Sequence, residues 1–154
     1  MIPFCRTIEE AQKVLKIMAK YGLERGKSIS SSNKFPLKVY VMAEIPSNAI
    51  LAKDFLKYFD GMSIGSNDLT QLVLGIDRDS AIIAGIGNEN NQAVKETIEE
   101  IIKECRKQKK YSGICGQAPS DFPEFANFLQ QIGIEAISLN PDSIIKTIIA
   151  LTNW

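Results

Sequence analysis

Short apolar runs alternate with longer stretches in which apolar residues recur every three or four positions, and this alternation constrains the fold more than any other feature of the chain. A short apolar run is typical of a buried strand, and the longer spacing is typical of an amphipathic helix. Strands that each lead into a helix form parallel sheets, because the helix carries the chain back to begin the next strand in the same direction. We therefore predict an α/β fold with five parallel strands. They are expected at residues 1–4, 38–43, 61–65, 112–115 and 136–139.

The predicted helices follow the strands in the same order. Thr7 and Glu10 have the spacing of a capping box at the start of a helix over residues 7–20. Ser47 is expected to cap a helix that runs to about Phe59 and turns Leu51, among other apolar residues, inward. Further helices are expected at residues 68–74 and 90–109, from Asp121 onward, and from Asn140 onward.

Length, charge and cysteine content narrow the class of protein. The chain has 154 residues, which suits a single domain over residues 1–154. Its 18 basic and 18 acidic residues give zero net charge, so we expect neither nucleic acid nor a membrane surface as partner. Its apolar runs fall short of the roughly 20 residues of a membrane-spanning helix, and residues 1–4 do not form a signal peptide. Three cysteines without metal-ligand spacing indicate reduced thiols and a cytoplasmic protein.

The chain contains no histidine. This excludes a phosphohistidine, a histidine base beside a serine or cysteine nucleophile, and an imidazole metal ligand within these residues. Any chemistry must therefore come from carboxylates, a thiol, amides and backbone groups.

Polar residues gather after four of the five predicted strands, at residues 44–48, 65–71, 115–121 and 140–143. Ligands of parallel α/β folds bind at the carboxyl ends of the strands. A doubly wound sheet of the flavodoxin type concentrates its site at one point, whereas a TIM barrel gathers every strand end around one mouth. Both folds suit the alternation of strands and helices, and the spread of polar segments favours the barrel.

Three side chains at these strand ends are candidates for chemistry. Glu44 follows the second strand and Asp68 follows the third, so neighbouring strands would let both bind one hard cation, Mg²⁺ or Mn²⁺. The alternatives are a simple strand-end carboxylate for Glu44 and a helix N-cap for Asp68. Cys115 could act as acid or base at a barrel mouth, or could be a packed thiol. Residues 65–67 could present backbone N–H groups to a carboxylate, although a plain turn explains the same residues.

Four segments resemble the PEP-utilising enzymes, the family of phosphoenolpyruvate synthase, pyruvate phosphate dikinase and enzyme I of the sugar phosphotransferase system. The likeness is to the C-terminal part of the synthases, and it runs in one register from residue 1 to about residue 150. The opening MIPFCRT fits the same region. The four segments are KVYVMAEIPSN (38–48), SIGSNDLTQLVLGIDRDS (63–80), GICGQAPSDFPEFA (113–126) and ISLNPDS (137–143).

The resemblance implies a TIM-barrel domain that binds pyruvate or phosphoenolpyruvate with Mg²⁺. It matches Glu44 and Asp68 to metal ligands and Cys115 to the thiol that exchanges a proton with C3 of the enolate. It places the substrate carboxylate at the backbone of residues 66–68. The phosphoryl group would come from a phosphohistidine on a separate domain, which fits a chain without histidine. The substrate-binding residues that it implies are Ser66, Asn67, Asp68, Gly116 and Gln117.

The sequence also departs from the family pattern. Residues 86–91 fall where the family carries a more charged stretch with an arginine, and the serine-rich residues 28–33 are a local elaboration. A TIM barrel needs eight strands and about 250 residues. Five strand–helix units therefore make a partial barrel, without the upstream arginines that in the family bind phosphate, and neither Arg6 nor Arg78 obviously replaces them. Bare sheet edges lead us to expect self-association.

We interpret the chain as the C-terminal, pyruvate-binding portion of a phosphoenolpyruvate synthase, an enzyme that converts ATP, pyruvate and water into AMP, phosphoenolpyruvate and phosphate. Alone it is expected not to carry out this reaction, because the nucleotide and phosphohistidine domains are missing. The alternative is a truncated, non-catalytic relative that serves as an assembly or binding module. A free-standing binding domain of the flavodoxin type is a third interpretation, in which Cys115 has no role.

Overall fold

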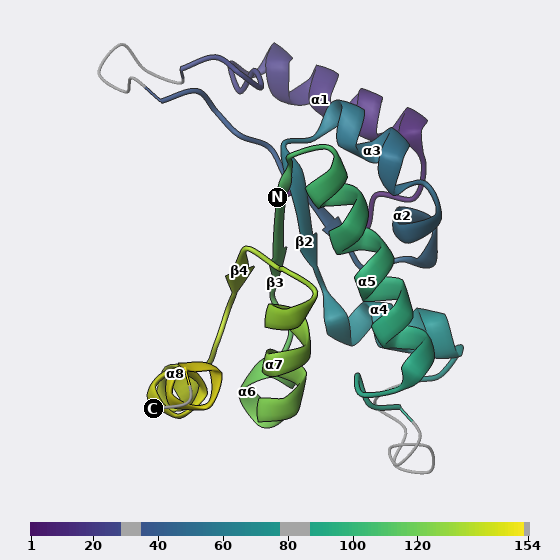
Figure 1. Ribbon diagram of the computed structural model, residues 1–154. Coiled ribbons are helices and arrows are strands. Elements are labelled where there is room, and N and C mark those ends of the chain that lie inside the picture. Colours follow the sequence, from purple (N-terminus) through teal and green to yellow (C-terminus); the bar gives the residue numbers. More distant parts are fainter. Residues whose placement is uncertain (29–34, 78–86, 153–154) are drawn as a thin grey trace.

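A computed structural model describes residues 1–28, 35–77 and 87–152. Within them, the sheet consists of four parallel strands in the order β1-β2-β3-β4 (Figure 1). Ile2 forms a single parallel bridge to Val41 at the place of the first predicted strand, so the predicted count of five strands is not confirmed. The strands are β1 (Val41–Ala43), β2 (Gly61–Ile64), β3 (Tyr111–Ile114) and β4 (Ala136–Ile137).

The consecutive strand order distinguishes the two predicted architectures. A flavodoxin-type sheet reverses its strand order at a switch point. The described strands contain no such reversal, because each pairs in parallel with the next one along the chain. The order is that of a sheet wound in one direction, as in barrels, and it contradicts the flavodoxin-type alternative.

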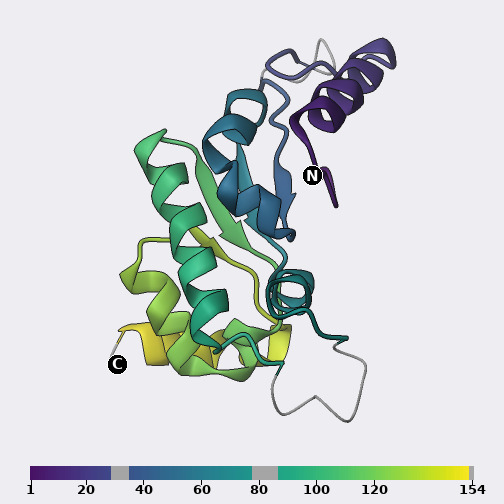
Figure 2. The ribbon, with the colours of Figure 1, turned by 90° about the vertical axis from the view of Figure 1, so that its right-hand side faces the viewer.

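Helices cover one face of this sheet. Figures 1 and 2 show α1, α2, α3 and α5 together on one side of β1, β2 and β3. No helix within the described residues is long and apolar enough to span a bilayer. The helices are α1 (Ile8–Lys20), α2 (Pro46–Ile50), α3 (Ala52–Tyr58), α4 (Ser66–Leu74), α5 (Gln92–Lys107), α6 (Ala118–Asp121), α7 (Pro123–Gln131) and α8 (Ile144–Thr152), with a 3₁₀ turn η1 (Pro141–Ser143) before α8.

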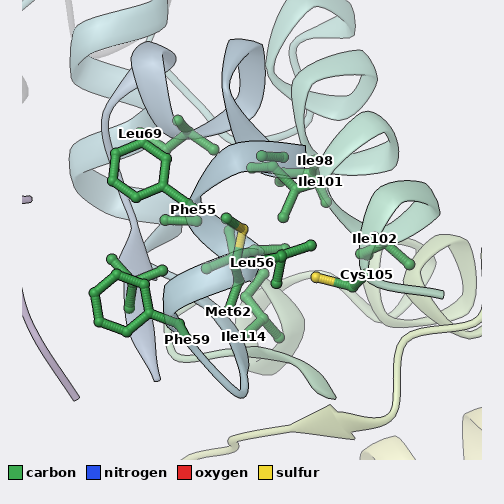
Figure 3. Close-up of a cluster of buried hydrophobic side chains, with 14 of the residues drawn as sticks. Phe55, Leu56, Phe59, Met62, Leu69, Ile98, Ile101, Ile102, Cys105 and Ile114 are labelled. Carbon is green, nitrogen blue, oxygen red and sulfur yellow. The ribbon is translucent and has the colours of Figure 1, made fainter. Parts of the chain in front are cut away.

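The main core lies between α3, α4, α5 and the sheet (Figure 3). Helix α5 has the apolar spacing predicted for it and packs on β2 and β3 through side chains such as Ile98 and Ile101. Cys105 belongs to this core, and its burial raises the pKa of the thiol to about 12. It is therefore a protonated, structural cysteine. The labelled core residues are Phe55, Leu56, Phe59, Met62, Leu69, Ile98, Ile101, Ile102, Cys105 and Ile114.

The predicted start of the first helix is confirmed. Thr7 is the N-cap of α1, and its Oγ1 accepts a hydrogen bond from the backbone N–H of Glu10 at 3.2 Å. The carboxylate of Glu10 returns to the backbone N–H of Arg6 at 2.7 Å, one residue before the capping-box position.

The helix predicted from Ser47 to Phe59 is two helices. Helix α2 begins at Pro46, whose fixed φ suits a first helical position, and Ile45 is its N-cap. Ser47 is therefore not the cap, and its hydroxyl donates to the backbone carbonyl of Arg6 at 3.1 Å instead. The chain leaves helical geometry at Leu51, which separates α2 from α3 and is 38% exposed rather than turned inward.

Helix α8 leaves most of its apolar stripe uncovered. Ile145 is 68% exposed, and Ile144, Ile148 and Ile149 are also exposed, although Thr147 between them is buried. An apolar patch of this kind marks a surface that is covered in a larger assembly or promotes association.

Candidate functional site

The ends of the four strands form one row at the same edge of the sheet. The register pairs Ala43 with Ile64, Ile64 with Ile114, and Ile114 with Ile137. The backbone ladder continues one residue further through hydrogen bonds from Gly65 N–H to the Ala43 carbonyl (3.1 Å), from Cys115 N–H to the Ile64 carbonyl (2.9 Å) and from Ser138 N–H to the Ile114 carbonyl (3.1 Å). Glu44, Gly65 and Cys115 therefore begin their polar segments at a shared rim, and Ser138 lies on the same rim two residues before the fourth segment.

Glu44 is buried at this rim, with 3% of its surface exposed. Its Oε1 accepts a hydrogen bond from the backbone N–H of Phe4 at 2.7 Å. Burial raises the pKa of the Glu44 carboxyl, the Phe4 N–H lowers it, and the negative charge of Asp68 raises it again. The two predicted carboxylates are therefore near enough for the charge of Asp68 to act on the Glu44 carboxyl.

Asp68 is the third residue of α4, which begins directly after β2. Gly65 occupies the N-cap position, so the alternative role of Asp68 as an N-cap is wrong. A side chain on Gly65 would have its Cβ 2.8 Å from Oε2 of Glu44. The missing side chain therefore lets the Glu44 carboxylate lie against Gly65, at the start of α4.

Ser66 is fully buried, and its Oγ has no hydrogen-bond partner among the described residues. It is the first residue of α4, where backbone N–H groups lack helical partners. Gly116 lies against this hydroxyl, because a Cβ on Gly116 would overlap Ser66 Oγ. An unsatisfied hydroxyl at a helix N-terminus is a suitable donor for an anionic group.

Cys115 is half-buried and has two polar contacts through its sulfur. The hydroxyl of Ser63 donates to Sγ at 3.4 Å, and the thiol contacts the Ile64 carbonyl at 3.6 Å. Ser63 was not identified from the sequence, because its contact with Cys115 spans 52 residues. The sequence pattern that could have identified Ser63 is a serine inside an otherwise apolar strand. It lies two residues before Gly65, so the two residues are on the same face of the sheet.

A pocket of about 280 Å³ opens beside the thiol. Four of the predicted site residues line it: Asn67, Cys115, Gly116 and Gln117. The other wall consists of Ser138, Leu139 and Asn140, which directly follow β4. Residues 138 and 139 were predicted to belong to the last strand, and only Asn140 was predicted to begin a polar segment. The backbone N–H of Asn140 donates to Ser120 Oγ at 2.9 Å and so ties this wall to the segment after β3.

The predicted site residues thus fall into two adjacent groups. Glu44, Ser66 and Asp68 are not among the residues that line the pocket. They adjoin it, since Asp68 follows Asn67 in the chain and Ser66 Oγ lies against Gly116. The structure therefore brings the carboxylate pair, the start of α4 and the thiol to one end of the sheet.

The donor set at the rim suits a hard, hydrated cation. In residues 1–28, 35–77 and 87–152 there is no group of three or more acidic, thiol or imidazole side chains that could hold a metal ion. Mg²⁺ binds through one or two carboxylates and keeps several waters, so the pair Glu44 and Asp68 fits it. The negative charge of Asp68 contributes to the raised pKa of the Glu44 carboxyl, and a nearby cation would offset this repulsion.

Other residues named from the sequence are exposed or lie outside the described residues. Arg6 is exposed and forms an ion pair with Glu10 at 3.3 Å. Arg78 and most of the serine-rich segment 28–33 lie outside the described residues, as does Ile86 at the start of the segment 86–91.

Comparisons with known proteins match the whole chain. The family model described as the PEP-binding domain of PEP-utilising enzymes matches residues 1–154. The chain is 56% identical over 151 residues to a phosphoenolpyruvate synthase of Aquifex aeolicus, and 50% identical over 151 residues to that of Escherichia coli. Each alignment covers 98% of this chain but only 17% and 18% of the relatives, so the chain spans about a sixth of their length.

Two solved structures share the fold at low sequence identity. A citrate lyase from Burkholderia xenovorans superposes with a TM-score of 0.63 at 17% identity, over 97% of this chain and 47% of that one. An HpcH/HpaI aldolase from Desulfitobacterium hafniense gives 0.62 at 20% identity, over 99% of this chain and 61% of that one. Both are TIM-barrel-like folds, and at these identities the likeness concerns the fold alone.

Proposed function

The chain belongs to the PEP-utilising enzymes, and from that premise we propose that it is the pyruvate- and phosphoenolpyruvate-binding part of a phosphoenolpyruvate synthase. It is homologous to the C-terminal PEP-binding part of those synthases. The observation that carries the proposal is the arrangement at the rim, where an interacting carboxylate pair adjoins a pocket lined by a half-buried thiol.

In this proposal Glu44 and Asp68 hold Mg²⁺ or Mn²⁺ beside the pocket. When bound, the cation would supply positive charge next to the oxygen on which negative charge develops. The first turn of α4 binds the substrate carboxylate, with the Ser66 hydroxyl and the side chain of Asn67 at that end. Gly116 permits the close approach of Ser66, and Gln117 completes the pocket wall.

Cys115 exchanges a proton with C3 of the substrate. Toward the enolate, the thiolate takes a proton from the methyl group of pyruvate, the C–H electron pair becomes the C2–C3 π bond, and the π pair of the C2 carbonyl moves onto its oxygen. In the reverse direction the thiol returns the proton to C3. The Ser63 hydroxyl donates to Sγ at 3.4 Å and so positions the sulfur that accepts and returns the proton.

The full conversion of ATP, pyruvate and water requires parts that this chain does not contain. The residues include no histidine to carry a phosphoryl group. We therefore propose that the nucleotide and phosphohistidine domains of a longer synthase are its partners, and that the 154-residue chain alone forms no phosphoenolpyruvate from ATP and pyruvate. A coupled assay for phosphoenolpyruvate on the purified chain tests this directly.

NMR in D₂O with Mg²⁺ measures the exchange of deuterium into the methyl group of pyruvate, and the exchange rate tests the proposed proton transfer. The wild-type chain should exchange the methyl protons above the buffer rate, and Cys115→Ala should reduce the rate to that of buffer. Cys105→Ala is the matched control, because it removes a buried thiol of the core and should leave the rate per folded molecule unchanged. Exchange at the buffer rate by the folded wild type would refute the proposal.

The second candidate, a non-catalytic assembly module, is favoured by the exposed isoleucines of α8. Thermal unfolding with Mg²⁺ and oxalate separates the two functions, because oxalate has the planar, charged shape of the pyruvate enolate. A surviving site predicts stabilisation that requires both compounds. The assembly module would be favoured if light scattering shows a large oligomer and Mg²⁺ with oxalate does not raise its unfolding temperature.

A further inference from the structure

The amide side chain of Asn48 joins three parts of the rim. It is fully buried in α2. Its Oδ1 accepts hydrogen bonds from the backbone N–H groups of Glu44 and Ile45, both at 3.2 Å, and its Nδ2 donates to the carbonyl of Cys5 at 2.8 Å. Both polar atoms of the amide are therefore used, and each bond ends on the backbone beside Glu44 or on the segment that covers it.

The segment at Phe4 and Cys5 contacts the Glu44 side chain itself. Phe4 has a φ of +50°, a left-handed conformation that non-glycine residues rarely adopt. In this conformation its N–H donates to Oε1 of Glu44 at 2.7 Å. Helix α2 holds the segment in place, because Asn48 binds the Cys5 carbonyl and Ser47 donates to the Arg6 carbonyl at 3.1 Å.

We infer that Asn48 is a positioning residue for Glu44. It fixes the backbone of Glu44 directly, and it fixes the carboxylate indirectly, because it binds Cys5 and the neighbouring Phe4 N–H donates to that carboxylate. With Oε1 engaged by Phe4, Oε2 is the oxygen directed toward Gly65 and the start of α4, where Asp68 lies. A metal ligand fixed in this way loses less rotational freedom when it binds an ion, and removal of such supporting hydrogen bonds typically lowers metal affinity about 10- to 100-fold. The inference rests on the proposed role of Glu44 as a metal ligand.

The test is the affinity of the chain for Mn²⁺, measured by electron paramagnetic resonance on wild type, Glu44→Gln, Asn48→Ala and Asn91→Ala. Wild type should bind one Mn²⁺ and Glu44→Gln should lose it. Asn48→Ala should raise the Kd about tenfold or more while circular dichroism shows a folded chain. Asn91→Ala is the matched control, because Asn91 caps α5 by accepting from Ala93 N–H at 2.9 Å and should lower the Tm without changing the Kd.

Asn48→Asp is a second variant that tests the inference if Asn48→Ala does not fold. It keeps an oxygen that accepts from Glu44 and Ile45 but loses the donor to Cys5, so Mn²⁺ should show a broadened, heterogeneous spectrum relative to wild type. A wild-type Kd and spectrum in every Asn48 variant that folds would overturn the inference alone. Failure of the wild type to bind Mn²⁺, or unchanged binding by Glu44→Gln, would instead overturn the proposed role of Glu44 and the inference with it.

Discussion

Ser63 illustrates how much of the candidate site depends on single hydrogen bonds. It is buried in β2, and its hydroxyl points to the sulfur of Cys115 on the neighbouring strand. A second buried serine, Ser112, lies on the next strand, but its Oγ has no partner among the described residues. Two serines of similar burial therefore differ in whether they contact the thiol, which makes them a matched pair.

Ser63→Ala should slow the deuterium exchange of pyruvate about fivefold, because a hydrogen bond contributes about 1 kcal/mol and this one positions the reacting sulfur. Ser112→Ala should leave the exchange rate unchanged, since it removes a hydroxyl with no partner among the described residues. NMR exchange rates at equal folded concentration check both variants. Equal rates in Ser63→Ala and wild type would show that the hydroxyl does not assist the thiol.

Glu44 predicts a dependence of stability on pH. Its pKa is raised above the unfolded value, mainly by burial, so the folded protein binds the proton more tightly. The stability that comes from the protonated carboxyl is complete below the unfolded pKa and is lost as pH rises through the folded pKa. Glu44→Gln removes this loss. It should raise the Tm relative to wild type at pH 8 without divalent cations, and the difference should vanish near pH 4.

Mg²⁺ provides the control for this prediction. Millimolar Mg²⁺ should raise the Tm of wild type at pH 8, because the cation offsets the buried charge, and it should not raise that of Glu44→Gln. Calorimetric scans of wild type and Glu44→Gln at pH 4 and pH 8 measure these Tm values. A Glu44→Gln variant that is less stable than wild type at pH 8 would contradict the assignment of a destabilising buried charge.

At the scale of elements, disturbing the close contact between the segment after β3 and the start of α4 should lower the free energy of unfolding. Gly116→Ala places a Cβ on Ser66 Oγ and should lower stability by about 1–3 kcal/mol, as overpacking does. It should also weaken stabilisation by Mg²⁺ with oxalate. The double variant Ser66→Gly with Gly116→Ala should recover part of the lost stability, because it removes the hydroxyl and Cβ that the new methyl group meets. Additive losses in denaturant titrations would argue against this contact.

The sequence predicted elements well where the apolar period was long or the strand was fully buried. Helix α5 and strand β2 lie within a residue or two of their predicted ranges for this reason. Prediction failed where two neighbouring residues each had a sequence pattern typical of a helix start. Ser47 resembles an N-cap, yet Pro46 begins the helix one residue earlier and the Ser47 hydroxyl bonds to Arg6 instead.

From the residue pattern alone the candidate site was predictable in its strand-end residues, and the resemblance to the family added Asn67, Gly116 and Gln117, which line the pocket. Glu44 and Cys115 stand out because each polar residue follows a buried run directly. Ser63 contacts a partner 52 residues away, so no local pattern identifies it. Asn48 has neighbours in Glu44 and Ile45, but its bond to Cys5 spans 43 residues, so its link to the segment that covers Glu44 has no local pattern. Residues of this kind become visible only when the strand register is known.

At the scale of the whole molecule, the uncovered isoleucines of α8 predict self-association. Ile145→Lys with Ile149→Lys should lower the average mass in light scattering at high concentration, because charged side chains replace exposed apolar surface. Ile50→Lys is the control, since Ile50 is 80% exposed on a different helix. An unchanged mass in the α8 variant and a lower mass in Ile50→Lys would place the contact at α2 instead.

The shared row of strand ends also limits how chains of this kind can change during evolution. A slip of two residues in one strand keeps each side chain on its face but moves it about 6.6 Å along the sheet, which separates Glu44 from Asp68 or Cys115 from Ser63. Insertions and deletions should therefore be rejected within the strands and directly after them. Connections that lead into the strands, at the opposite edge, are free to vary in length.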